Sequence, residues 1–163
     1  MLEEDSIGDI INKMKYTDNI YYIVTLFDEV LNDLKQHQLF TNKNFTILGK
    51  KYEDNIIFTL VKKNTIRLDI FINEDSLEIH IDKTAETFVY SLEMIKNNEQ
   101  HIKNVLKMIF TSKIKVKYCG KNYTKIYFII NNEVLNTFVF RKGLSFFKQK
   151  CNKKIYPPIF GEL

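Results

Sequence analysis

The chain is organised around residues 113–141, which read KIKVKYCGKNYTKIYFIINNEVLNTFVFR. Three segments rich in apolar residues lie within it, at 113–118, 123–130 and 134–141. Short runs of turn-forming residues separate them, and apolar and polar side chains alternate clearly in the first. This pattern predicts three antiparallel strands joined by tight turns, the second turn at Asn131-Asn132.

A similar pattern occurs earlier in the chain. Gly49-Lys50-Lys51-Tyr52 parallels Gly120-Lys121-Asn122-Tyr123, and an apolar segment follows each copy. An amphipathic helical pattern also precedes each copy. We therefore predict an α+β fold in which amphipathic helices pack on antiparallel meanders and the helix-then-meander order occurs twice. Internal duplication and two unrelated halves are both consistent with this order.

The chain is long enough for a single compact domain over 1–163, with candidate halves at 1–84 and 85–163. Apolar residues at helical spacing predict helices at 6–15, from 18 to between 37 and 40, and from 85 or 88 to 110. Between the last two, residues 45–82 predict a meander of about four strands, the first closed by Gly49-Lys50-Lys51. The tail after Gly143 is predicted to be irregular, with an extended part near Pro157-Pro158.

Charge is distributed very unevenly along the chain. The whole chain carries 24 Lys or Arg and 20 Asp or Glu, a formal net charge of +4. Residues 1–100 hold 11 basic and 18 acidic side chains, whereas residues 101–163 hold 13 and 2. Such asymmetry between halves predicts an acidic surface and a basic surface on the folded protein.

Several classes of protein find no support in the sequence. The chain has none of the glycine-rich phosphate-binding or nucleophile motifs, so we predict no cofactor and no enzymatic activity. The start of the chain is acidic rather than basic, and no apolar run approaches the ~18 residues of a membrane span. We therefore predict a cytoplasmic protein without membrane contact, in which Cys119 and Cys151 are free thiols.

Two constellations could still carry chemistry. Cys119 could act as a nucleophile if His80 or His101 lay beside it, although nothing in the spacing requires that. Glu78, His80 and Asp82 would share one strand face and could bind a cation, but a solvated strand face explains the same pattern. We accordingly predict no catalytic residues and no metal site.

The leading functional hypothesis is a non-catalytic protein-binding module. Its sharpest form is an immunity protein or inhibitor that neutralises a basic toxin or nuclease by electrostatically matched binding. The predicted contact residues are acidic side chains of the first half: Asp28, Asp33, Glu53, Asp54, Glu74, Asp75 and Glu78.

The alternative hypothesis is a nucleic-acid-binding or regulatory protein that uses the basic half. Lys113, Lys115 and Lys117 should share one strand face, and Lys121 and Lys125 follow across the turn. Interleaved aromatic residues would suit base stacking beside phosphate neutralisation. Lysines on an exposed strand also prevent aggregation between sheet edges, which is the alternative explanation of the same residues.

Overall fold

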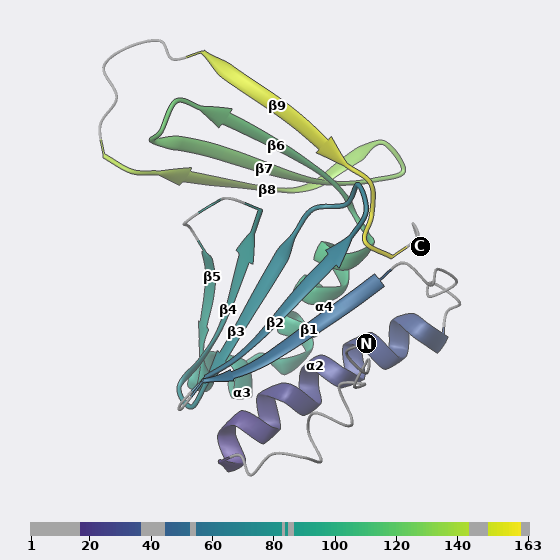
Figure 1. Cartoon of the computed structure of the whole chain (residues 1–163), viewed down its shortest axis with the longest axis vertical. Coiled ribbons are helices and arrows are strands. Elements are labelled where there is room, and N and C mark those ends of the chain that lie inside the picture. The colour runs from purple at the N-terminus through teal and green to yellow at the C-terminus, as the bar shows by residue number, and fades with distance from the viewer. Residues whose placement is uncertain are drawn as a thin grey trace.

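The computed structural model describes residues 17–36, 45–52, 55–82, 84, 87–143 and 150–160. Within this part the protein has three helices and two antiparallel sheets, which confirms the predicted α+β fold (Figure 1). The elements are, in chain order, α2 (Asp18–Gln36), β1 (Phe45–Tyr52), β2 (Asn55–Lys62), β3 (Leu68–Asn73), β4 (Ser76–Ile81), β5 (Thr87–Ser91), α3 (Leu92–Asn97), α4 (Glu99–Thr111), β6 (Lys113–Cys119), β7 (Tyr123–Ile130), β8 (Glu133–Arg141) and β9 (Cys151–Tyr156).

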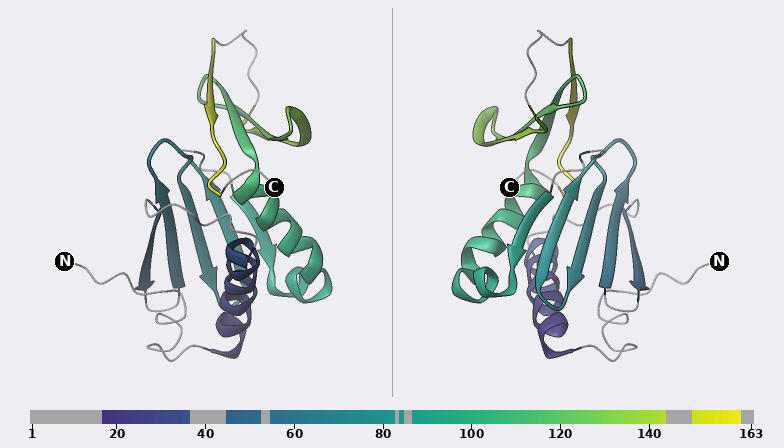
Figure 2. Two further views of the ribbon diagram at one scale, coloured as in Figure 1. Left: turned by 90° about the vertical axis from the view of Figure 1, so that its right-hand side faces the viewer. Right: turned by 90° about the vertical axis from the view of Figure 1, so that its left-hand side faces the viewer.

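Sheet A is a meander in which β1 to β5 pair in chain order. Every second residue of its inner strands is buried, as in β3, where Leu68, Ile70 and Ile72 are inaccessible to solvent. Helices α2 and α4 lie on this apolar face (Figure 2). Phe27 of α2 stacks on Phe58 of β2, with ring centroids 5.6 Å apart, so helix and sheet share one core.

Sheet B has the strand order β8-β7-β6-β9 and lies across one end of sheet A (Figure 1). Its buried face carries Ile114, Val116, Ile126 and Phe128, all inaccessible to solvent. Phe88 of β5 contacts this face edge-on. Its ring centroid lies 4.4 Å from that of Phe138 and 6.4 Å from that of Phe128. The hydrophobic core therefore continues from one sheet into the other.

A polar contact joins the sheets at the end of β4. Asp82 has a left-handed backbone, with φ of 55°, and its N–H donates to the carbonyl oxygen of Arg67 at 2.8 Å. The side-chain oxygen Oδ2 of Asp82 accepts hydrogen bonds from the hydroxyls of Tyr118 in β6 and Tyr156 in β9. Sheet B is thus fixed to sheet A by polar as well as aromatic contacts.

The helix predicted to start at 85 or 88 is wrong in its first part. Residues 87–91 instead form β5, which makes the first meander five-stranded, and the helical region is divided into α3 and α4 at Asn98. Phe88, Val89 and Tyr90 are types that favour strands, and pairing with β4 decides their conformation. The side chain of Ser91 then accepts a hydrogen bond from the N–H of Met94 and caps α3.

The turn predicted at Gly49-Lys50-Lys51 is also wrong. These residues lie inside β1, where Gly49 pairs with Phe58 of β2. Gly120, by contrast, lies in the turn between β6 and β7 with φ of 61°. The two glycines of the repeated motif therefore occupy different positions, and the motif gives no support to an internal duplication. The predicted turn at Asn131-Asn132 is confirmed, with φ of 50° and 64°.

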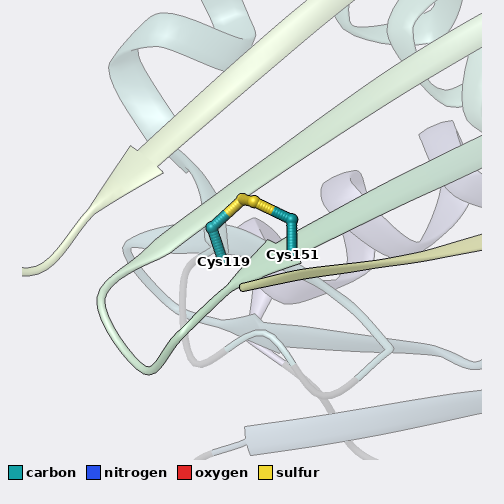
Figure 3. The surroundings of a disulfide bond; sticks show 2 residues. All are labelled: Cys119 and Cys151. Atoms are coloured by element: carbon teal, nitrogen blue, oxygen red, sulfur yellow. A yellow bond between two sulfur atoms is a disulfide. The ribbon is translucent and has the colours of Figure 1, made fainter. Parts of the chain in front are cut away.

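The tail contains a strand that the sequence analysis missed. β9 pairs antiparallel with β6, and this register places Cys151 directly opposite Cys119. The two form a disulfide with an S–S distance of 2.05 Å, so the prediction of free thiols is wrong (Figure 3). The error arose because the sequence does not show that the tail returns to β6. The predicted helix at 6–15 lies outside the described residues.

Candidate anion-binding face

Sheet B presents a second face that points away from the core. In β6 the even-numbered Ile114 and Val116 are buried, so the odd-numbered lysines lie on the opposite side. We call this side the outer face. The strand registers assign to it Lys113, Lys115, Lys117, Tyr123, Lys125, Tyr127, Ile129, Val134, Thr137, Val139, Arg141, Lys153 and Ile155, together with the disulfide.

Three lysines form a row across the outer face. Lys117 of β6 lies directly opposite Lys125 of β7 on one side and Lys153 of β9 on the other. Side chains in such positions have their Cβ atoms roughly 5 Å apart, and like charges there destabilise a sheet. Among the described residues, no carboxylate forms an ion pair with any of the three. The row is therefore a concentration of uncompensated positive charge.

Acidic residues are scarce around the row. In the four strands of sheet B the single acidic side chain is Glu133, at the exposed start of β8. It lies at the opposite end of the β7–β8 hairpin from Arg141. Within these four strands the outer face thus carries Lys113, Lys115, Lys117, Lys125, Arg141 and Lys153, and no acidic residue of the strands lies among them.

Two tyrosine rings lie among these cations. The Nζ atoms of Lys115 and Lys125 are 5.2 Å and 4.9 Å from the ring centroid of Tyr127. Cζ of Arg141 is 5.6 Å from the ring centroid of Tyr123. These are cation–π distances, so each aromatic ring is held next to positive charge.

The structure brings most of the predicted basic residues together. Lys113, Lys115, Lys117 and Lys125 share the outer face, whereas Lys121 lies in the turn between β6 and β7. Sequence reasoning missed Arg141, and it counted Lys153 only as part of a basic tail of unknown position. The alternation within β8 could have placed Arg141 beside Tyr123, but nothing in the sequence indicated that β9 would add Lys153 to the row.

The described acidic residues of the predicted contact set lie in three separate places. Asp28 and Asp33 are on α2, where Asp28 accepts a hydrogen bond from Asn32 and Asp33 pairs with Lys107 at 2.7 Å. Glu78 is on the face of sheet A opposite α2, 3.3 Å from Nε2 of His80. Glu74 and Asp75 are in the β3–β4 turn, at the end of sheet A far from sheet B (Figure 1). Glu53 and Asp54 lie outside the described residues.

A polar groove of about 390 Å³ lies between α2 and α4. It is lined by Glu29, Asn32, Asp33, Gln100, Lys103 and Lys107. Nζ of Lys103 lies 2.7 Å from Glu29 and 2.6 Å from Glu99, and the hydrogen bond from Lys103 is the main cause of a lowered Glu99 pKa. The charges of this groove neutralise one another, unlike those of the lysine row.

The structure brings together neither the Cys119–histidine pair nor the set of Glu78, His80 and Asp82. Cys119 is held in the disulfide, so it cannot supply a thiolate to a histidine. Asp82 points to Tyr118 and Tyr156 rather than joining Glu78 and His80. In the described ranges no group of three or more His, Cys, Asp or Glu side chains could hold a metal ion.

Within the same ranges, no helix combines the length and apolarity needed to span a membrane. No family model, curated protein or solved structure matches this chain. Function is therefore inferred from the geometry of the outer face and of its surroundings.

Proposed function

We propose that this protein is a non-catalytic binding protein that holds an anionic macromolecule against the outer face of sheet B. The observation that carries the proposal is the row of Lys125, Lys117 and Lys153 on three neighbouring strands. Their mutual repulsion lowers the stability of the free protein. A bound polyanion would remove this cost and gain the free energy of counterion release.

Protection against aggregation does not explain the row. Lysines serve that purpose on edge strands, where backbone groups are free to pair with another chain. Lys117 and Lys125 lie on β6 and β7, which are the two inner strands of sheet B, and only Lys153 is on an edge. Two of the three charges therefore need another reason for their position.

Charge reversal at Lys117 tests the proposal. In Lys117→Glu a carboxylate would stand between Lys125 and Lys153, neutralising the row from within. We expect binding to a panel of single-stranded DNA, duplex DNA, heparin and polyglutamate, measured by fluorescence anisotropy, to weaken at least tenfold for whichever polyanion binds. Lys63→Glu is the matched control, because it makes the same change of charge at an exposed position between β2 and β3 of sheet A. Equal losses in both variants would mean that net charge alone drives binding, and no binding by the unmodified protein would refute the proposal.

A second candidate is the neutralisation of a basic protein by the acidic end of sheet A, as in an immunity protein or inhibitor. The specific observation is the β3–β4 turn, in which Glu74 and Asp75 are both exposed. Oδ1 of Asn73 accepts hydrogen bonds from the N–H groups of Asp75 and Ser76 at 2.9 Å and 2.7 Å, which fixes the turn. The partner would be a basic protein such as a nuclease.

Neutralising this turn would separate the two candidates. Glu74→Gln/Asp75→Asn should slow association with a basic nuclease at low salt, since rim charges act mainly on the association rate. An unchanged rate would exclude the acidic end, whereas Lys117→Glu should leave that rate largely intact.

The predicted cytoplasmic location stays a prediction. The Cys119–Cys151 disulfide favours an oxidising compartment, because disulfides rarely persist in the reducing cytosol. Alkylation of the protein in unreduced extracts of its own cells would decide, since a cytosolic protein should show two reactive thiols.

A further inference from the structure

We infer that the ligand of the outer face is a single-stranded nucleic acid, whose phosphates contact the lysines while its bases stack on Tyr123 and Tyr127. This inference rests on the proposed function and narrows it to one class of polyanion. The two aromatic rings on the outer face support it independently of the charges.

Aromatic rings and cations contact each other on the outer face. The side-chain nitrogens of Lys115 and Lys125 lie over the ring of Tyr127, and the guanidinium of Arg141 lies over that of Tyr123. A base that stacks on either ring therefore takes the place of a cation, which turns to the phosphate beside that base. Sulfated polysaccharides and acidic peptides offer negative charge but no repeating aromatic plane. A nucleic acid offers both in every nucleotide, and proteins that bind single strands combine a basic groove with aromatic stacking platforms.

The lysines of β6 and the tyrosines of β7 are regularly spaced along their strands. Lys113, Lys115 and Lys117 follow one another at every second residue of β6, so their Cα atoms are about 7 Å apart. Such a line of charges can follow the backbone of an extended single strand. The two tyrosines are on β7, the adjacent strand, and are separated by one intervening outer-face residue, Lys125. Phosphates along β6 would thus leave bases over β7.

The outer face suits a single-stranded nucleic acid better than a duplex. In a duplex the bases are stacked on one another and paired, so they cannot stack on side chains of a flat sheet. Four strands spaced about 4.8 Å apart give a face roughly 15 Å wide, which suits one extended strand. A duplex could reach the lysines but would leave both tyrosines without a partner.

Binding of labelled oligonucleotides by the full chain tests the inference. An oligonucleotide of about 20 nucleotides should bind more tightly in single-stranded form than as a duplex. Tyr123→Leu/Tyr127→Leu keeps apolar side chains on the strand but removes the aromatic planes, and we expect it to lose about tenfold or more in affinity. Tyr123→Phe/Tyr127→Phe should restore most of that loss. Tyr21→Leu, an exposed tyrosine on α2, is the matched control for surface substitution.

The dependence on salt supplies an independent readout. The leucine variant should keep the slope of log affinity against log salt, since its phosphate contacts remain. Lys117→Gln should reduce that slope by about 0.7, the contribution of one phosphate contact to a single strand. Thermal melts of each variant establish that it is folded.

The results distinguish a single-strand site from a general anion-binding face. Equal affinity for single strand and duplex, or leucine variants that bind like the unmodified protein, would overturn the inference and leave the anion-binding face. Binding of only heparin or polyglutamate would likewise overturn it and identify another class of polyanion. Absence of binding to every polyanion would refute the proposed function itself.

Discussion

Tyr156 donates a hydrogen bond of 3.1 Å to Asp82, which lies 74 positions earlier in the chain. The same carboxylate accepts from Tyr118, so two strands of sheet B are attached to one turn at the end of sheet A. The contact is partly buried, which makes it more than a surface interaction. It fixes the outer face of sheet B relative to the rest of the protein.

Removing the shared acceptor should destabilise the fold. Asp82→Ala removes this acceptor from the hydroxyls of Tyr118 and Tyr156 and also places alanine in a left-handed backbone, so we expect a loss of about 1.5–3 kcal/mol or more in the free energy of unfolding. Tyr156→Phe breaks one of the two bonds and should cost about 1 kcal/mol. Urea denaturation measures both. If Asp82→Ala unfolds at the same urea concentration as the unmodified protein, the two hydrogen bonds that Asp82 accepts contribute nothing to stability.

The same tyrosine predicts a dependence of stability on alkaline pH. Burial, reinforced by the negative charge of Asp82, raises the pKa of Tyr156 from 10.0 to about 12. A raised pKa means that the folded state holds its proton more tightly, so this contribution is complete below pH 10 and is lost between about pH 10 and 12. Tyr156→Phe should flatten the fall of stability in that window. Identical pH profiles for both proteins would contradict this.

The disulfide should stabilise sheet B measurably. Cys119 and Cys151 are 32 positions apart, and in the chain-entropy model closing a loop of that length contributes about 3–4 kcal/mol. Reduction of the unmodified protein should lower its free energy of unfolding by up to this amount. Cys119→Ala/Cys151→Ala should start from the lowered value and respond no further to reductant. A response of the double variant would show that reductant acts elsewhere.

Truncation of Phe27 should be the most costly single change in the helix layer. Its ring stacks on Phe58 and meets Phe110 of α4 edge-on, with centroids 5.9 Å apart. Phe27→Ala would leave a cavity between α2, sheet A and α4, at a cost of about 3–5 kcal/mol. Tyr21→Ala, exposed on the same helix, should cost less than about 1 kcal/mol. Similar losses from both would show that α2 is not anchored by Phe27.

The lysine row predicts opposite effects on stability and on binding. Lys117→Thr removes two direct like-charge contacts and adds a residue that favours strands, so thermal denaturation should occur at a higher temperature. The free energy of unfolding should rise by roughly 0.5–1 kcal/mol. If Lys117 belongs to a binding site, the variant should be more stable but bind polyanions less tightly, because functional sites often sacrifice stability. A destabilised variant would show that Lys117 is needed for folding.

The fold was predictable where periodicity was strong and local. The stripe of α2 and the alternation in β3, β4 and β6 were read correctly, because each pattern directly reflects burial on one face. β5 was missed because Phe88 is at helical spacing from Leu92 and Ile95, and only pairing with β4 shows that residues 87–91 form a strand. Gly49 was misread because a glycine inside a strand looks like a turn.

The candidate site was predictable only in part. The lysines of β6 could be assigned to one face from their alternation alone. The row itself depends on the pairing of β6 with both β7 and β9, and the second pairing links residues far apart in the chain. Sequence separation also hid the disulfide, since Cys119 and Cys151 meet only through that pairing.

The order of the strands also bears on how the protein folds. Sheet A is made of consecutive hairpins, so each of its pairings closes a short loop. β9, by contrast, pairs with β6 across the intervening β7 and β8, and such non-local contacts are slow to establish. We therefore expect refolding to proceed in stages, in which the hairpins appear first and the arrival of β9 limits the rate at which the outer face becomes complete.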